Sequence, residues 1–146
     1  MSTFRSIEWK EDRLIILDQR ELPEETRYIE LRTVKQVAEA IKNMVVRGAP
    51  AIGVAAAYGI LLAALGSNDE REMYECLRRA DELLRSSRPT AVNLFWALDR
   101  MRKIWENFKG NVEELKKLLE REAKAIEMED VSTNLAIAKN GAQLVP

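Results

Sequence analysis

Two short segments place an arginine and a proline directly before an expected helix. They are Arg47-Gly48-Ala49-Pro50 and Ser87-Arg88-Pro89-Thr90. The first turn of a helix presents unpaired N–H groups and the positive end of the helix dipole, so it attracts anions. Arginine adds a planar charge that suits phosphate, and Gly48 allows a ligand or the backbone to come close. If the two helices pack side by side, both segments contribute to one anion site.

A purely structural role is the alternative for these segments. Gly48 would then serve a tight turn, and Arg47 would pair with a carboxylate of the protein. The sequence alone leaves both interpretations open, because it does not show whether the two arginines meet.

The composition excludes several kinds of catalytic centre. The 146 residues include no histidine and one cysteine. A histidine-based triad, a zinc site and a disulfide within the chain are therefore excluded. Cys76 lies beside the apolar face of an expected helix, and we interpret it as a small core residue because no histidine can activate it.

Charge and aromatic content indicate which partners the chain lacks. The net charge is -1 and aromatic residues make up 6% of the chain, so neither a basic surface nor stacking platforms favour nucleic acid. With 47% apolar and 32% charged residues, the composition is that of a globular protein. The first residues lack the apolar core of a signal peptide, and we expect a cytoplasmic protein.

The segment 50–65 is apolar at nearly every position and is followed by Gly66. A helix that is apolar on every face must be buried, in a protein core or in a membrane. This one is too short to cross a bilayer comfortably, and Gly53 and Gly59 weaken it as an isolated span. It is predicted to be a central core helix, closed by Gly66 as a C-cap.

The remaining segments predict a small sheet and further helices. Three short strands are expected at 7–9, 14–17 and 27–31. Four more helices are expected. The first follows a capping box of Thr33 and Gln36, the second follows a cap at 67–70, and the third extends from Thr90 to Asn107. The fourth extends from 112 to about 140, with a break or bend at 130–133 and a C-cap at Asn140-Gly141. The aromatic residues of the third of these, including Trp96 and Trp105, are interpreted as core. The predicted fold class is mostly α (α+β), with a small three-stranded antiparallel sheet beside a bundle of about five helices.

Three stretches in this order closely resemble the N-terminal domain of the methylthioribose-1-phosphate isomerase family. They are LDQR at 17–20 with Leu22-Pro23, VVRGAPAIGVAAAYG at 45–59, and SRPTAVNLFWAL at 87–98. That family belongs with the regulatory-type subunits of the initiation factor 2B exchange factor and with ribose-1,5-bisphosphate isomerase. The resemblance extends from about Trp9 to Gly141.

The resemblance implies the interconversion of methylthioribose 1-phosphate and methylthioribulose 1-phosphate in methionine salvage, with no metal or organic cofactor. Carried over by motif, Arg47, Gly48, Ala49 and Arg88 would bind the sugar-phosphate substrate. The catalytic cysteine and aspartate of the family belong to a second, Rossmann-like domain. We therefore expect no catalytic residue in this chain, and no activity from it alone.

The resemblance also predicts how the chain is organised. Residues 1–146 would form the N-terminal domain of a longer enzyme, with the small β sheet at 1–32 and the helical bundle at 33–141. The C-terminal domain of the same enzyme would be its partner, and the complete protein would be a homodimer. Two alternatives stay open: a regulatory or scaffold subunit of the initiation factor 2B type, and a ribose-1,5-bisphosphate isomerase-like protein.

Overall fold

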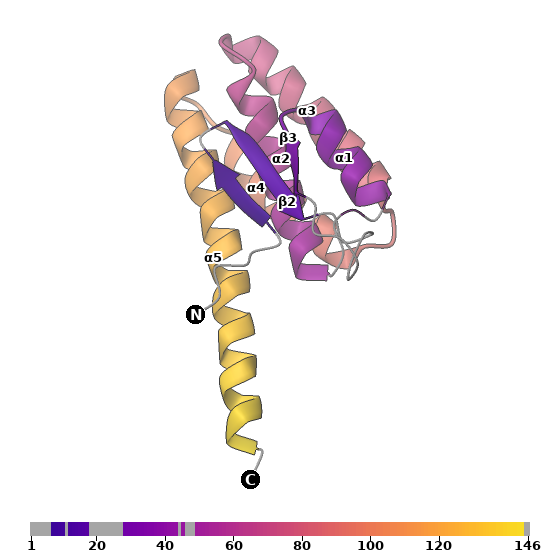
Figure 1. Cartoon of the computed structure of the whole chain (residues 1–146). Coiled ribbons are helices and arrows are strands. Elements are labelled where there is room, and N and C mark those ends of the chain that lie inside the picture. The colour runs from indigo at the N-terminus through magenta and orange to yellow at the C-terminus, as the bar shows by residue number, and fades with distance from the viewer. Residues whose placement is uncertain (1–6, 11, 18–27, 44, 46–48, 145–146) are drawn as a thin grey trace.

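The computed structural model describes residues 7–10, 12–17, 28–43, 45 and 49–144, with the backbone alone at 49 and 130–144. Three strands and five helices follow one another in these ranges (Figure 1). They are β1 (Ile7–Lys10), β2 (Arg13–Leu17), β3 (Tyr28–Leu31), α1 (Val34–Lys42), α2 (Ala49–Leu65), α3 (Glu70–Ser87), α4 (Val92–Trp105) and α5 (Val112–Leu144). The predicted fold class, mostly α with a small antiparallel sheet, is confirmed.

Helix α2 lies at the centre and contacts the four other helices and the first two strands. Its side chains are buried on every side, with at most 2% of their surface exposed at Val54, Ala55, Ala56, Ala57, Tyr58, Ile60, Leu61 and Ala64. The prediction of a central core helix is thus confirmed, and Gly66 beyond its end donates its N–H to the carbonyl of Leu62 at 3.2 Å. Among the described residues, none of the helices combines the length and the apolar character that a membrane span requires.

The sheet is an antiparallel meander in the order β1-β2-β3. Ile7 pairs with Ile16, and Leu14 pairs with Leu31. These four side chains are buried because alternate residues of a strand face the same side, here the helices. The sheet packs against α2 through β1 and β2 and against α1 through β3.

One stacked pair of aromatic rings joins the sheet to the central helix. Trp9 of β1 stacks on Tyr58 of α2, with ring centroids 5.0 Å apart and an interplanar angle of 6°. The Tyr58 hydroxyl donates a hydrogen bond to the carboxylate of Glu127 on α5. Tyr58 of α2 therefore contacts both the sheet and α5 with one buried side chain.

Two predicted helix caps are confirmed. Thr33 and Gln36 form a reciprocal capping box at the start of α1, with Gln36 N–H donating to Thr33 Oγ1 at 3.2 Å. Asp69, within the predicted cap at 67–70, is the N-cap of α3 and accepts from Glu72 N–H at 3.2 Å. These side chains satisfy N–H groups that a helix start otherwise leaves unpaired.

Other predicted helix boundaries are wrong. Ala91, rather than Thr90, is the N-cap of α4, because the chain turns after Pro89 and Ala91 N–H donates to the carbonyl of Arg88 at 3.0 Å. Helix α4 ends at Trp105, before Asn107. Helix α5 continues to Leu144 without a break at 130–133 or an end at 140–141. Residues 130–133 contain neither glycine nor proline, so their weak helix preferences do not interrupt it.

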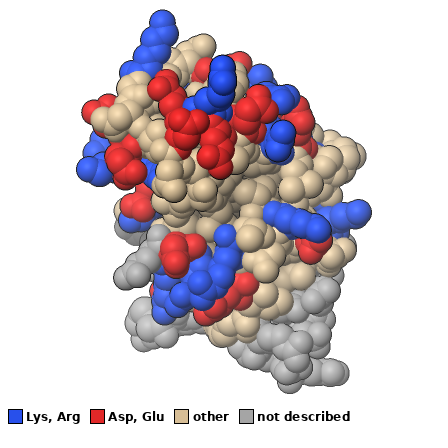
Figure 2. Space-filling model, turned by 90° about the horizontal axis from the view of Figure 1, so that it is seen from above, with Lys and Arg blue, Asp and Glu red and all other residues tan. Residues whose placement is uncertain are grey.

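Charges of both signs are interspersed on the face that Figure 2 shows, with no large area of one sign. On α5, oppositely charged side chains pair along the helix. Lys116 pairs with Glu113 at 3.6 Å and Lys124 with Glu120 at 3.4 Å, at spacings that bring side chains together on a helix.

The buried phenol of Tyr58 makes stability depend on pH in the alkaline range. Burial, followed by the bond to Glu127, raises the pKa of Tyr58 far above its ordinary value of 10.0. The unfolded chain then loses the phenol proton near pH 10 while the folded chain keeps it, so this contribution to stability is complete below pH 10 and lost above it. Between about pH 10.5 and 12, the free energy of unfolding should fall by about 1.4 kcal/mol per pH unit more steeply in the wild type than in Tyr58→Phe.

Urea denaturation across the pH range measures this difference. Between about pH 7 and 9 the free energies of unfolding of the wild type and Tyr58→Phe should differ by a constant amount. In this range the Tyr58 phenol keeps its proton in both the folded and the unfolded chain. Parallel curves for the two proteins above pH 10.5 would contradict the prediction.

Candidate anion-binding site

The two predicted binding segments lead into α2 and α4, and neither helix has an acidic residue in its first turn. The N-cap of α4, Ala91, makes no side-chain hydrogen bond. By contrast, α3 starts with Asp69 as its cap and acidic residues in its first turn, and α5 starts with two glutamates. The positive ends of α2 and α4 are therefore less neutralised than those of α3 and α5.

The first turns of α2 and α4 pack side by side. A Cβ atom added to Gly53 would lie 3.1 Å from the carbonyl oxygen of Asn93 and 3.5 Å from Cβ of Ala97. A glycine at this position thus allows the two backbones to approach closely. The side-by-side packing that a shared anion site requires is present at this end of the bundle.

An open hollow of about 390 Å³ lies between these helix starts and α5. Its lining residues are Pro50, Gly53 and Val54 of α2, Asn93 and Trp96 of α4, and Ile126 and Glu129 of α5. Small-molecule sites typically have this size and combine mostly apolar walls with a few polar groups. The hollow can therefore take a ligand whose charged end meets the helix starts.

The structure describes two of the four predicted binding residues. Ala49 is the first residue of α2. Arg88 is the C-cap of α3, with an extended backbone (φ -147°, ψ 85°) that suits a residue before proline. Its half-buried side chain has no hydrogen bond or ion pair within the described part of the chain, so its charge is available to a ligand. Arg47 and Gly48 lie outside the described residues, and their convergence with Arg88 stays a prediction.

An ion-pair cluster at the rim of the hollow was not predicted. Arg100 of α4 donates to both carboxylate oxygens of Glu129, at 2.9 and 2.5 Å, and also to Glu122. The bonds to these carboxylates raise the pKa of Arg100, and the bond from Arg100 lowers the pKa of Glu129. The Glu129 carboxylate is therefore held ionised, which suits positioning better than proton transfer. The sequence does contain a signal for this cluster, because Glu122 and Glu129 are two helical turns apart and therefore lie on one face of α5.

The prediction that Trp96 belongs to the core is wrong. Its side chain is 51% exposed at the hollow, with the Arg100 guanidinium 5.4 Å from its ring centroid. The buried face of α4 is formed by Leu94, Ala97, Leu98, Met101 and Trp105. Trp96 falls outside this face, whereas Trp105 is buried as predicted.

The starts of α2 and α4 can bind an anion through their N–H groups, whereas the charged Glu129 carboxylate repels an anion on the α5 side of the hollow. Among the described lining residues Glu129 is the one ionisable side chain, and Arg100 keeps it in the charged form. The described part of the site thus supplies binding groups, and a proton donor or acceptor would have to come from elsewhere.

Comparison with known proteins assigns the chain to a family. The model of the initiation factor 2 subunit family matches residues 45–146, and the chain belongs to this family. A protein named methylthioribose-1-phosphate isomerase 2, from Pseudothermotoga lettingae, is 64% identical over 146 residues, which cover 100% of this chain and 42% of that protein. The resemblance drawn from the sequence motifs is confirmed.

Two crystal structures share the fold. That of 5-methylthioribose 1-phosphate isomerase from Pyrococcus horikoshii has a TM-score of 0.92 and 43% identity, over 97% of this chain and 41% of that one. That of the translation initiation factor eIF-2B subunit delta from A. fulgidus has a TM-score of 0.81 and 46% identity, over 88% and 38%. The chain therefore spans about 40% of the length of these relatives.

The close approach of α2 and α4 can be tested with one substitution at two positions of the same helix. Gly53→Ala and Gly59→Ala gain the same helix propensity, but the new methyl group meets different atoms. At Gly53 it meets a backbone carbonyl at 3.1 Å, whereas at Gly59 it meets side-chain methyl groups of Leu84 and Val37 at 3.1 and 3.3 Å, which can shift without moving a backbone. We expect Gly53→Ala to be less stable than Gly59→Ala by about 1 kcal/mol in chemical denaturation. Equal stability of the two variants would show that α4 moves freely away from α2.

Proposed function

We propose that this chain is the N-terminal domain of an aldose–ketose isomerase that converts methylthioribose 1-phosphate into methylthioribulose 1-phosphate. The observation that carries the proposal is the pair of helix starts without acidic residues at an open hollow. Arg88, which precedes α4 in the chain, has no hydrogen bond or ion pair within the described part of the chain. This is an arrangement for the phosphate end of a sugar phosphate. The name of the relative that is 64% identical supports the choice of substrate.

In this proposal the domain holds the substrate and the chemistry occurs beside it. Arg47 and Arg88 bind the phosphate, and the backbone N–H groups at Gly48 and Ala49 add hydrogen bonds at the start of α2. A fixed phosphate places the first two carbons of the sugar at one position for proton or hydride transfer. The catalytic cysteine and aspartate are supplied by a Rossmann-like domain that follows residue 146, without a metal or organic cofactor.

The organisation of the complete protein is part of the same proposal. Residues 1–32 and 33–141 serve as the sheet and helical parts of one N-terminal domain, which packs against the C-terminal domain of the same chain. The complete enzyme is a homodimer that acts in methionine salvage in the cytoplasm. The length of the relatives, more than twice that of this chain, supports a further domain.

A regulatory subunit is the second candidate. The fold shared with the eIF-2B subunit delta structure favours it, since that protein has 46% identity over most of this chain. An isomerase assay separates the two candidates. Turnover of methylthioribose 1-phosphate by this chain extended with its native downstream sequence, and not by the 146 residues alone, supports the isomerase with a divided site. No turnover by either protein supports the regulatory subunit.

Substitution of the predicted phosphate ligands tests the site itself. In the extended protein, Arg88→Ala and Arg47→Ala should each raise KM for methylthioribose 1-phosphate by about tenfold or more, because each removes a charge-assisted hydrogen bond worth about 1.5–3 kcal/mol. Arg79→Ala is the matched control, since Arg79 is highly exposed on α3 and lines none of the described pockets. An unchanged KM in both site variants would overturn the assignment of the phosphate site.

A further inference from the structure

Trp96 of α4 is the largest exposed apolar side chain among the described residues that line the hollow at the starts of α2 and α4. It is 51% exposed, although tryptophan side chains are highly buried on average. Val92, four residues earlier, is also exposed, and residues at this spacing lie on the same face of a helix. An apolar surface therefore extends along α4 from its first residue to the hollow.

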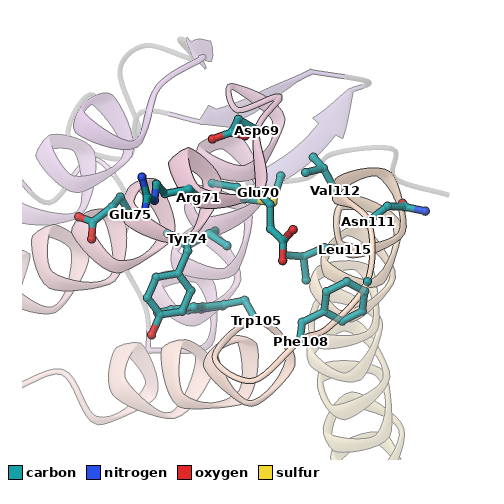
Figure 3. A pocket seen from close by; sticks show the side chains of 13 residues that line it. Asp69, Glu70, Arg71, Tyr74, Glu75, Trp105, Phe108, Asn111, Val112 and Leu115 are labelled. Atoms are coloured by element: carbon teal, nitrogen blue, oxygen red, sulfur yellow. The ribbon is translucent and has the colours of Figure 1, made fainter.

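The other tryptophan of α4 has a different environment. Trp105, at the opposite end of the helix, is 3% exposed and packs edge-on against Tyr74, with ring centroids 5.6 Å apart. Figure 3 shows this pair beside a second pocket, of about 510 Å³, where α3 and α5 begin. Trp105 thus belongs to the core, whereas Trp96 leaves half of its surface accessible at an open hollow. Accessible aromatic side chains are typical of the walls of ligand sites.

Charged groups fix the position of the Trp96 ring. The guanidinium of Arg100 lies over the ring, 5.4 Å from its centroid. Arg100 is itself held by Glu129, through two hydrogen bonds at 2.9 and 2.5 Å, and by Glu122. A binding group that is held in place before the ligand arrives loses less entropy when the ligand binds.

The charges around the hollow determine which end of a ligand meets Trp96. Glu129 is ionised, because the hydrogen bond from Arg100 lowers its pKa, and it lines the α5 side of the hollow. Its carboxylate repels a phosphate group on that side, whereas the starts of α2 and α4 attract one. The remaining lining residues near Trp96 are apolar, with Val54 and Ile126 both buried. A ligand with one phosphate therefore binds with its phosphate at the helix starts and its uncharged end toward Trp96.

The dimensions of the site match a five-carbon sugar phosphate. At 1.5 Å per residue, Trp96 lies about 7.5 Å along α4 from the N-cap Ala91. A sugar with a phosphate on its first carbon and a methylthio group on its fifth spans such a distance. The sulfur of a thioether is polarizable and makes favourable contacts with aromatic rings. We propose that Trp96 is a specificity-determining residue whose ring contacts the methylthio group of methylthioribose 1-phosphate, an inference that rests on the proposed function.

Two substrates that differ only in the methylthio group test this contact in the chain extended with its native downstream sequence. 5-Deoxyribose 1-phosphate has the same sugar and phosphate but lacks the methylthio group. In the wild type, kcat/KM should be higher for methylthioribose 1-phosphate. Trp96→Ala should lower kcat/KM for methylthioribose 1-phosphate about tenfold and change that for 5-deoxyribose 1-phosphate by less than about twofold. Because both substrates are measured on the same protein, the ratio of the two values does not depend on the folded fraction.

Two further variants complete the comparison. Trp96→Phe keeps an aromatic ring and should retain most of the preference for the methylthio substrate. Leu83→Ala is the matched control and should leave the preference unchanged, since Leu83 is exposed on α3 and lines none of the described pockets.

The outcomes separate this inference from the proposed function. An unchanged preference in Trp96→Ala would overturn the inference and leave the proposed function standing, because the wild type would still turn over its substrate. An equal loss for both substrates would also overturn it, since that result is expected when Trp96 packs against a further domain. No turnover of either substrate by the extended wild type would overturn the proposed function and this inference with it.

Discussion

The burial of α2 is the constraint on which the rest of the structure depends. This helix is apolar on all faces, and no single neighbouring helix or sheet can cover it. Four helices and the sheet surround it, and each contributes one apolar face while keeping its charged side chains in water. The amphipathic pattern of the other helices is therefore a consequence of the one helix that has no polar side.

The same packing gives the bundle two chemically different ends. At one end, α2 and α4 start without acidic residues, and the glycine at position 53 brings their first turns together. At the other end, α3 and α5 start with acidic residues and with side-chain caps. Helices that run side by side in the same direction place their dipole ends together, so the choice of first-turn residues sets the charge preference of each end.

Much of the fold was predictable because it follows from local patterns. The capping box of Thr33, the cap at Asp69 and the alternation in the strands each depend on neighbouring residues. The exposure of Trp96 and the pairing of Arg100 with Glu129 were not predictable in this way. Both depend on the rotation of α4 relative to α5, which sequence spacing within one helix does not determine.

The candidate site likewise combines features that the sequence predicts with features that only the structure shows. The motifs predict four binding positions, and the structure adds the hollow at the starts of α2 and α4 and the ion pairs at its rim. Contacts between residues far apart in the chain create both features. Of the four positions, Arg47 and Gly48 lie outside the described residues, and their role stays a prediction from the sequence.

The continuous helix α5 projects from the rest of this domain. Its first half is packed against α2 and α4, and its last half extends beyond the other elements (Figure 1). At 1.5 Å per residue, the backbone beyond Glu129 reaches about 22 Å further. A tilt of α5 by about 10° at the point where Glu129 pairs with Arg100 would move the end of α5 by about 4 Å.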